Sequence, residues 1–393
     1  MLAVPADQLF RDIAGQNHVA LAVSGGSDSM AMLRLAVRAL RVKLSVLTVN
    51  HDLRPEAALE AEKVREWTTA LGIEHHTLVW SAPQPAQSKA RTARYDLMAD
   101  WCEAHAVSWL LTAHTLDDQA ETVLMRLART ASLDSLAGIP RLGHWRAIRL
   151  LRPLLSERHQ TLRDMLRGLG QQWVEDPSNE DERYERVRIR KALPQLAALG
   201  ITAESLSELA AQATQAVHAL SCAADDWVAL HAKAHDAGYC AIPRNTFAGQ
   251  TKVLQARILG RLLSRYGAGL VPEPAELAHL ADWAAEGSSR RTLGGAIIAA
   301  RKAHLLIGRE PGRISTAPVM VPASGEMFWD GRFTVWAKPG SQIIPEFCAG
   351  TSPRHKDFPA FVQKALPAVI MAGGGICIPH LGVGSGAEAV FQP

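Results

Sequence analysis

A glycine- and serine-rich segment between an apolar run and a helical pattern constrains this 393-residue chain more than any other feature. Residues 18–23 before it have the composition of a short buried strand, and apolar residues recur at helical spacing over 30–40. A turn of this kind exposes unpaired backbone N–H groups at the positive end of a helix dipole, which suits phosphate. The segment reads Ser24-Gly25-Gly26-Ser27-Asp28-Ser29. No lysine follows the glycines, so it is not a Walker A loop, and a flexible turn without a ligand is the plain alternative.

Composition describes an ordinary globular chain that is long enough for two or three domains. The chain has neither a signal-peptide pattern nor an apolar run of membrane-span length, so we expect no contact with a membrane. Its five cysteines include no Cys-x-x-Cys pair, which favours the reducing cytoplasm and disfavours a zinc site or an iron–sulfur cluster. The net charge is only +3, but residues 141–191 carry twelve Lys and Arg against eight Asp and Glu. This local excess of positive charge permits a nucleic-acid partner.

Strand-like and helix-like segments alternate over the first part of the chain, which predicts a doubly wound, mainly parallel α/β sheet. The expected strands are 18–24, 44–49, 75–80 and 109–113, and the expected helices are 29–41, 57–71, 89–105 and 117–129. Ligands of such sheets bind at the carboxyl ends of the strands. The glycine-rich segment, His51 and His114 all follow expected strands, so we expect them to lie at one edge of the sheet.

The pattern changes after about residue 200. Long helical patterns replace the alternation, at 203–235, 250–266 and 274–286, and a hairpin-like pair follows at 291–299 and 303–309. Further along, Asp330-Gly331 between aromatic and β-branched residues is a hairpin signal. The sequence therefore predicts an α/β domain over 1–200, a mostly helical domain over 203–310 and a small β-containing appendage over 320–393.

A second informative segment runs from 112 to 122, where an expected strand passes into a helix. Asp118 and Glu121 are three residues apart and therefore share one helical face, while Asp117 lies near the N-cap. Acidic residues in a first turn also stabilise a helix through its dipole, which is the plain alternative. Beside a phosphate loop, the same pair suits Mg²⁺ or the ammonium group of a substrate.

Three further stretches complete a characteristic order of motifs. They are His51-Asp52-Leu53-Arg54-Pro55, then Ala90-Arg91-Thr92-Ala93-Arg94-Tyr95, and finally Leu151-Arg152-Pro153-Leu154-Leu155 with Trp173-Val174-Glu175-Asp176-Pro177-Ser178-Asn179 and the arginine run up to Arg190. Together with the phosphate loop and Asp117-Asp118-Gln119-Ala120-Glu121-Thr122, they resemble the tRNA(Ile)-lysidine synthetases, a family of PP-loop ATP pyrophosphatases. The resemblance is dense over 18–192 and weaker beyond. It implies a PP-loop fold, similar to that of adenine nucleotide α hydrolases.

The resemblance also implies a reaction. ATP would adenylate the C2 oxygen of the wobble cytidine, C34, in the isoleucine tRNA that carries a CAU anticodon, with release of pyrophosphate. The ε-amine of free L-lysine would then displace AMP and leave lysidine, which makes the enzyme a ligase that changes codon specificity from AUG to AUA. Because the amine is the nucleophile, catalysis would depend on positioning and charge stabilisation.

By the same resemblance, each candidate residue receives an expected role. ATP would be bound by Ser24, Gly25, Gly26, Ser27, Asp28, Ser29 and His51, with Asp28 holding Mg²⁺. The catalytic residues would be Asp28, Asp118 and Glu121, and lysine would meet Asp118, Glu121 and Arg188. The tRNA phosphates would meet Arg91, Arg94, Arg188 and Arg190.

The chain departs from the family pattern at three places. Asp52 stands where the family usually has glycine, Thr115 where it often has a second histidine, and Thr130-Ala131-Ser132 replaces a Gly-Ser-Gly loop. Lost glycines remove backbone freedom near the nucleotide, which puts the catalytic rate in question. Three alternatives therefore stay open: another PP-loop tRNA-modifying enzyme such as a thiolase, a small-molecule amide ligase, and a degenerate copy that only binds tRNA. The oligomeric state also stays open, with a homodimer among the choices.

Overall fold

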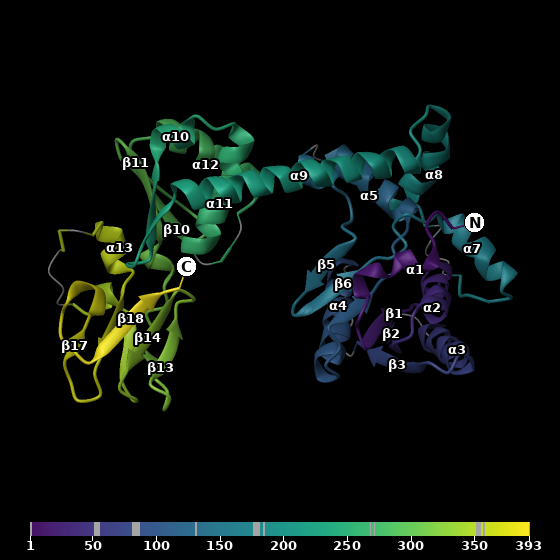
Figure 1. The fold of residues 1–393 in the computed structure, drawn as a ribbon, viewed down its shortest axis with the longest axis horizontal. Coiled ribbons are helices and arrows are strands. Elements are labelled where there is room, and N and C mark those ends of the chain that lie inside the picture. Colours follow the sequence, from purple (N-terminus) through teal and green to yellow (C-terminus); the bar gives the residue numbers. More distant parts are fainter. Residues whose placement is uncertain are drawn as a thin grey trace. The chain divides into compact units, whose positions relative to one another are not determined.

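The chain folds into two compact units, Met1–Val217 and His218–Pro393, each with its own hydrophobic core (Figure 1). The computed structural model describes residues 2–50, 56–80, 87–129, 132–175, 181–183, 185–267, 269–270, 272–350, 355–356 and 358–392. The division between the units falls inside the long helix α9 (Ala203–His231). Among the described helices, none is long and apolar enough to cross a membrane.

A six-stranded sheet in the order β3-β2-β1-β4-β6-β5 forms the centre of the first unit. Its strands are β1 (His18–Ala22), β2 (Lys43–Asn50), β3 (Glu74–Val79), β4 (Trp109–Leu111), β5 (Leu142–Trp145) and β6 (Ile148–Leu151). All neighbouring pairs run parallel except β5 and β6, which run antiparallel. The doubly wound, mainly parallel fold expected from the sequence is confirmed, and the four expected strands end within two residues of their expected bounds.

Helices cover both faces of this sheet because its strands are apolar on both sides. Along β1, Val19 and Leu21 pack in one core cluster with α2 and α7, while Ala20 packs in another with α4. This alternation follows from the two-residue period of a strand. The helices of the unit are α1 (Ala6–Leu9), α2 (Ser27–Ala39), α3 (Glu56–Ala70), α4 (Gln87–Ala104), α5 (Leu116–Arg129), α6 (Leu133–Leu136), α7 (His159–Gly168) and α8 (Glu185–Ala198), followed by the start of α9.

The strand order places the site. From β1 the chain moves through β2 to β3 on one side of the sheet, and β4 lies on the other side of β1. The sheet therefore has its topological switch point between β1 and β4, where the loops that follow the two strands separate. The phosphate loop follows β1 and the acidic segment follows β4, so the strand order brings the two motifs together.

The second unit combines helices with antiparallel sheets. Residues 233–310 form a five-stranded sheet in the order β7-β8-β11-β10-β9, which accompanies the helices expected there. Its elements are β7 (Lys233–His235), β8 (Tyr239–Pro243), α10 (Arg244–Ala248), α11 (Lys252–Tyr266), α12 (Pro274–Glu286), β9 (Arg290–Leu293), β10 (Ala296–Ala300) and β11 (His304–Arg309). The helix expected over 203–235 was wrong at its end, because α9 stops at His231 and β7 follows, while β8 lies in a part of the chain that the periodicity assigned to no strand. Strands as short as three to five residues carry too little pattern to be recognised.

The C-terminal strands expected from the sequence are also found. They form a four-stranded sheet, β12-β15-β16-β17, and a three-stranded sheet, β13-β14-β18. The strands are β12 (Val319–Met320), β13 (Glu326–Trp329), β14 (Phe333–Ala337), β15 (Gln342–Pro345), β16 (Pro367–Ile370), β17 (Ile376–Cys377) and β18 (Ala387–Phe391), with α13 at Ala360–Lys364. The predicted hairpin joins β13 to β14, and its Asp330 and Gly331 both have positive φ, as an Asp-Gly turn requires.

Candidate active site

The loop between β1 and α2 presents the first turn of α2 to a ligand. Gly26 is the N-cap of this helix, and no side chain caps its amides. The loop is held by its own serines: the Ser24 amide donates to the Ser29 hydroxyl at 3.2 Å, and that hydroxyl donates to the Gly26 carbonyl at 2.9 Å. A second tie runs from the Val174 amide to the Gly25 carbonyl at 2.8 Å. The result is a helix N-terminus with no side-chain cap, which is the kind of structure that suits an anion.

Gly25 and Gly26 make unequal demands on the loop, which gives a matched pair of substitutions. Gly25 has φ +90°, and a Cβ there would lie 3.0 Å from Val64 and 3.1 Å from Val174. Gly26 has an ordinary φ of −67°, and its Cβ would meet only the Ser24 hydroxyl at 3.7 Å. We expect Gly25→Ala to cost about 2 kcal/mol and to lower the melting temperature by roughly 4–8 °C, with Gly26→Ala within about 2 °C of wild type. Thermal unfolding followed by circular dichroism measures both, and equal melting temperatures would contradict the strain at Gly25.

The first turn of α5 is closed by a reciprocal cap. Thr115 donates to Asp118 Oδ2 from its amide at 2.9 Å and from its hydroxyl at 3.1 Å, and the Asp118 amide donates to the Thr115 hydroxyl at 3.3 Å. This is a capping box, so threonine at this position stabilises the start of the helix. The other oxygen of the carboxylate, Asp118 Oδ1, lies 4.0 Å from Arg186. Asp118 therefore caps the helix with Oδ2, while Oδ1 faces Arg186 of α8.

Glu121 lies one turn further along α5 and is fully buried. Its Oε1 accepts a 2.7 Å hydrogen bond from Arg190 Nε, and its Oε2 lies 3.4 Å from Arg186 Nε. Burial raises the pKa of the Glu121 carboxyl, while the Arg190 hydrogen bond opposes that rise. Oε2 accepts no hydrogen bond from the described residues. A buried carboxylate oxygen without a donor is costly, so this atom is suited to a donor that arrives with a ligand.

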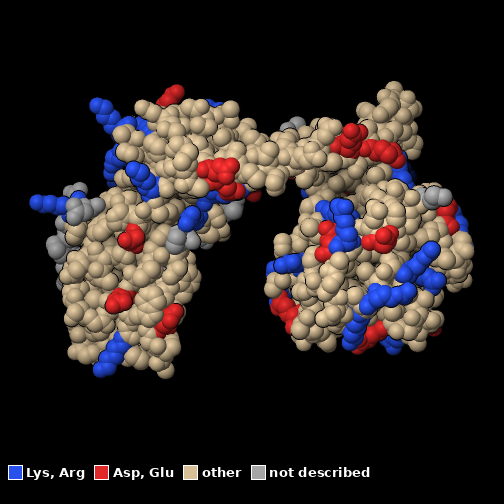
Figure 2. Space-filling model, viewed as in Figure 1, with Lys and Arg blue, Asp and Glu red and all other residues tan. Residues whose placement is uncertain are grey.

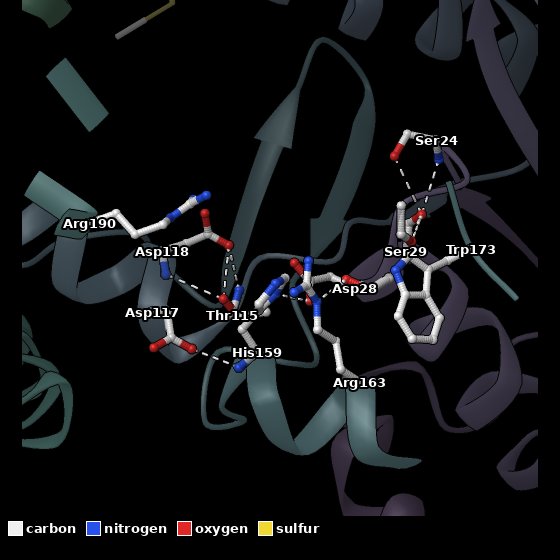
Figure 3. A network of polar contacts seen from close by, with 12 residues as sticks. Ser24, Asp28, Ser29, Thr115, Asp117, Asp118, His159, Arg163, Trp173 and Arg190 are labelled. Carbon is white, nitrogen blue, oxygen red and sulfur yellow. Dashed lines mark hydrogen bonds and ion pairs between the residues drawn. The ribbon is translucent and has the colours of Figure 1, made fainter. Parts of the chain in front are cut away.

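Helix α7 joins the phosphate loop to the acidic segment. The His159 ring lies 2.5 Å from Asp28 Oδ1 through its Nδ1, while the His159 amide donates to Asp117 at 2.7 Å. Arg158 donates to the second oxygen of Asp117 at 2.9 Å, so Asp117 holds the start of α7. Burial raises the pKa of the Asp28 carboxyl, while the hydrogen bond with His159 and the charge of Arg163 oppose that rise. Figure 3 shows these groups in one continuous network between α2, α5 and α7.

A cavity of about 340 Å³ opens between these groups. Its lining combines ionisable side chains, among them Asp28, Asp118, Glu121, His159 and Arg190, with apolar residues of α8 and α9. The remaining lining residues are Thr115, Asp117, Arg158, Gln160, Leu193, Pro194, Ala197 and Ala203. The cavity therefore joins the first turn of the phosphate-loop helix to the carboxylates of α5, inside the first unit.

Known proteins share both the domain and the length of this chain. A family model described as a PP-loop domain matches residues 2–197. A tRNA(Ile)-lysidine synthase from Ruegeria pomeroyi is 36% identical over the whole chain and 97% of its own length. Those from Rhodopseudomonas palustris and Methylobacterium nodulans are 38% and 39% identical over 79% and 75% of this chain, and 96% and 91% of their own. The chain belongs to the tRNA(Ile)-lysidine synthase family. The resemblance stated from the motifs is thus confirmed, and ATP use follows from the PP-loop family.

A solved structure with a related fold is more distant. The U34-tRNA thiolase NcsA from Methanococcus maripaludis, with its [4Fe-4S] cluster, is 17% identical and covers 53% of this chain and 77% of its own, with a TM-score of 0.46. That similarity is too low to bear on function. In the present chain, no cysteine is among the described residues that line the cavity. Burial raises the pKa of the Cys102 thiol to about 12.

The structure brings together only some of the residues to which the sequence analysis gave a role in the site. Asp28, Asp118, Glu121 and Arg190 line one cavity. Arg188 is elsewhere: its guanidinium donates to the carbonyls of Glu182 at 2.8 Å and Arg183 at 3.1 Å, and it is not among the described lining residues.

The other expected residues are more scattered. Arg91 lies over the Tyr95 ring at 5.1 Å, and Arg94 is exposed on the same helix. Burial lowers the pKa of His114 to about 4, which keeps its ring neutral at pH 7. His51, Asp52, Thr130 and Ala131 lie outside the described residues.

Several site residues escaped the sequence analysis. Arg186 reaches both acids of α5, and the signal was present, since Arg186 and Arg190 are four residues apart and share one helical face. His159 and Asp117 were missed as partners because nothing in the local pattern connects residues that are about 40 or more positions apart in the chain.

Proposed function

We propose that this chain catalyses the reaction of its family, as an ATP-dependent ligase that attaches L-lysine to C2 of C34 in the isoleucine tRNA with a CAU anticodon. The observation that carries the proposal is one cavity that joins an uncapped phosphate-loop helix to two carboxylates. In the first step the C2 oxygen bonds to the α-phosphorus of ATP, and the bond to the β-phosphate oxygen breaks. In the second step the lysine ε-nitrogen bonds to C2 and loses a proton. The bond between C2 and its oxygen breaks, and AMP leaves with that oxygen.

At the phosphate end, the residues fit a magnesium ion that arrives with the nucleotide. Mg²⁺ is commonly held by one or two carboxylates together with substrate phosphates. Asp28 is the carboxylate in the first turn of α2, and only its Oδ1 contacts His159. When bound, the metal would supply charge neutralisation at the phosphates, and Asp28 would hold it.

At the amino-acid end, charge and shape match lysine. Asp118 and Glu121 supply carboxylate oxygens for an ammonium group, including the buried Oε2 that accepts no bond from the described residues. Arg190 brings a guanidinium that suits the lysine carboxylate. Leu193, Pro194 and Ala197 from α8 form an apolar wall against which the four methylenes of lysine can pack. The cavity thus offers both charges and a length of apolar surface.

The proposed tRNA contacts are spread over several elements of the chain. We assign phosphate contacts to Arg91, Arg94 and Arg188, whereas Arg190, also expected there from the sequence, lies in the cavity against Glu121 and is assigned to lysine. The tRNA body is assigned to the mostly helical domain at 203–310, which in the sequence separates the PP-loop domain at 1–200 from the appendage at 320–393. Figure 2 shows basic and acidic side chains interleaved on the viewed face of the first unit. Binding would therefore depend on individual phosphate contacts more than on a uniform field.

Salt dependence measures those contacts. Wild-type affinity for tRNA should fall steeply as the salt concentration rises. Arg188→Ala should lower the affinity, and it should reduce the slope of log affinity against log salt concentration by about one unit. The control is Arg146→Ala, because Arg146 already pairs with Asp100 at 2.5 Å and Glu103 at 2.6 Å and releases no counterion. The measurement is tRNA affinity at several salt concentrations, and equal slopes for wild type and Arg188→Ala would remove Arg188 from the interface.

The decisive experiment incubates the full chain with ATP, labelled lysine and total tRNA. Label in the isoleucine tRNA with a CAU anticodon, with equal amounts of AMP and pyrophosphate, supports the proposal. Modification without lysine would indicate another PP-loop tRNA-modifying enzyme, and tRNA binding without AMP release would indicate a degenerate copy. An amide ligase would release AMP with lysine or another small acceptor and no tRNA. We place the reaction in the cytoplasm, where tRNA and ATP are available. That the chain forms a homodimer stays a prediction, which a molar mass from light scattering would test.

A further inference from the structure

Helix α7 lays two basic side chains, one turn apart, against the start of the phosphate-loop helix. His159 contacts Asp28, and Arg163 donates from Nε to the Ser27 hydroxyl at 3.3 Å. Residues four apart on a helix share a face, so both contacts come from one side of α7. Figure 3 shows Arg163 rising from α7 between His159 and Trp173 toward Asp28. A cationic side chain therefore lies beside the first turn of α2, whose amides have no side-chain cap and suit a phosphate.

The position of Arg163 is set by packing and by a cap. Leu162 and Leu166 of α7 are fully buried in the same core cluster as α2. Asp117 accepts from the His159 amide at 2.7 Å and so anchors the first turn of α7. A helix held at its start and along its apolar face presents its polar side chains in a defined place. Arg163 is therefore pre-organised beside the loop.

The charge of Arg163 interacts with Asp28, the carboxylate that would hold the metal, and is otherwise only weakly paired. Its ion-pair partner is Glu175, at 4.0 Å, and the Glu175 side chain is 72% exposed. The next arginine on the helix, Arg167, differs, since it pairs with Asp164 at 2.7 Å and lies over the Trp173 ring. An exposed and distant carboxylate contributes little to an ion pair. Arg163 thus keeps a positive charge that an anion at the loop can use.

We propose that Arg163 binds the β- and γ-phosphates of ATP and stabilises the diphosphate as it leaves. The phosphate loop has no lysine of its own, so this charge comes from α7. As the C2 oxygen bonds to the α-phosphorus, the bond to the β-phosphate oxygen breaks, and that oxygen keeps the electron pair. A planar guanidinium matches two phosphate oxygens at once and neutralises the charge that develops. This inference rests on the proposed function for the reaction in which the diphosphate leaves.

Three ligands separate this role from a structural one. AMP has no β- or γ-phosphate, ATP has both, and inorganic pyrophosphate consists of that part alone. We expect Arg163→Ala to weaken the binding of ATP and pyrophosphate by about 10- to 100-fold and to leave the binding of AMP within about twofold. Arg163→Lys keeps the charge without the planar fork and should fall between wild type and alanine. Arg167→Ala is the matched control on the same helix and should bind all three ligands as wild type does.

The measurement is equilibrium binding of each ligand to the full chain by titration calorimetry in the presence of Mg²⁺, with a melting curve for each variant. Unchanged affinity of Arg163→Ala for ATP and pyrophosphate would overturn the proposal, as would an equal loss for AMP. If Arg163→Ala does not fold, the comparison of Arg163→Lys with wild type decides. Selective weakening of ATP and pyrophosphate in a chain whose wild type attaches no lysine to tRNA would support the role of Arg163 and overturn the proposed function.

Discussion

Replacing Asp28 with alanine is expected to lower the rate of ATP-dependent lysine attachment by roughly 100- to 1,000-fold. The carboxylate lies in the first turn of the phosphate-loop helix, where it would hold the metal that accompanies ATP. No other acidic side chain belongs to that first turn. Asp118 and Glu121 lie across the cavity and are already engaged by Thr115 and Arg190. Among the described lining residues, Asp28 is therefore the one carboxylate in the first turn of the phosphate-loop helix.

The same substitution should cost little stability. A carboxylate in a first helical turn contributes about 0.3–1 kcal/mol through the helix dipole, which corresponds to a shift of at most roughly 4 °C in melting temperature. Asp28→Asn separates charge from shape, because the amide can still bond with His159, and it should lose nearly as much activity. Release of pyrophosphate with tRNA present measures the rate, and circular dichroism measures the melting temperature. Full activity of either variant would show that Asp28 serves only to cap its helix.

The sequence predicted the central part of the fold because its pattern is strong there. The run Val19-Ala20-Leu21 is apolar on both faces, as a strand buried between two layers must be, and β1 is such a strand. Helix α7 was not predicted: among its ten residues only Leu162 and Leu166 are buried. The strands β5 and β6 have four residues each, too few for periodicity to distinguish them from a loop. Elements of this kind depend on tertiary packing.

The residues of the site also fall into those that local sequence pattern predicts and those that depend on tertiary packing. The phosphate loop and the pair Asp118 and Glu121 were predictable, because their roles follow from local spacing at the end of a strand. Arg188 was expected beside the acids, yet Arg186 and Arg190 contact Glu121 instead. Residues two apart on a helix point to nearly opposite sides, whereas residues four apart share a face. Helical periodicity alone could have made that choice, but the pairing of Asp28 with His159 joins residues 131 positions apart and needed the structure.

Replacing Glu121 with glutamine is expected to raise the KM for lysine by roughly 30-fold or more while changing the KM for ATP by less than about threefold. Glu121 is the only fully buried acid among the described lining residues, and it carries the Oε2 atom that accepts no bond from them. In a site shielded from water, a lost charge partner weakens an ammonium ligand far more than it would at the surface. The phosphate end of the cavity keeps all its groups in this variant, so ATP should be little affected.

Stability has to be separated from binding for this variant. The charge of Glu121 is shared by Arg190 and Arg186, whose side chains remain 48% and 43% exposed, so water can solvate both arginines after the change. The cost in folding free energy should therefore stay near about 1–2 kcal/mol, below that of breaking a pair in which both partners are buried. The matched control is Glu103→Gln, which also removes a carboxylate from an arginine, Arg146 at 2.6 Å, at an exposed place on α4. Steady-state kinetics with lysine and ATP varied in turn decides the matter: equal increases in both KM values would assign Glu121 to the metal or to the helix, whereas a selective increase for lysine places the amino acid against α5.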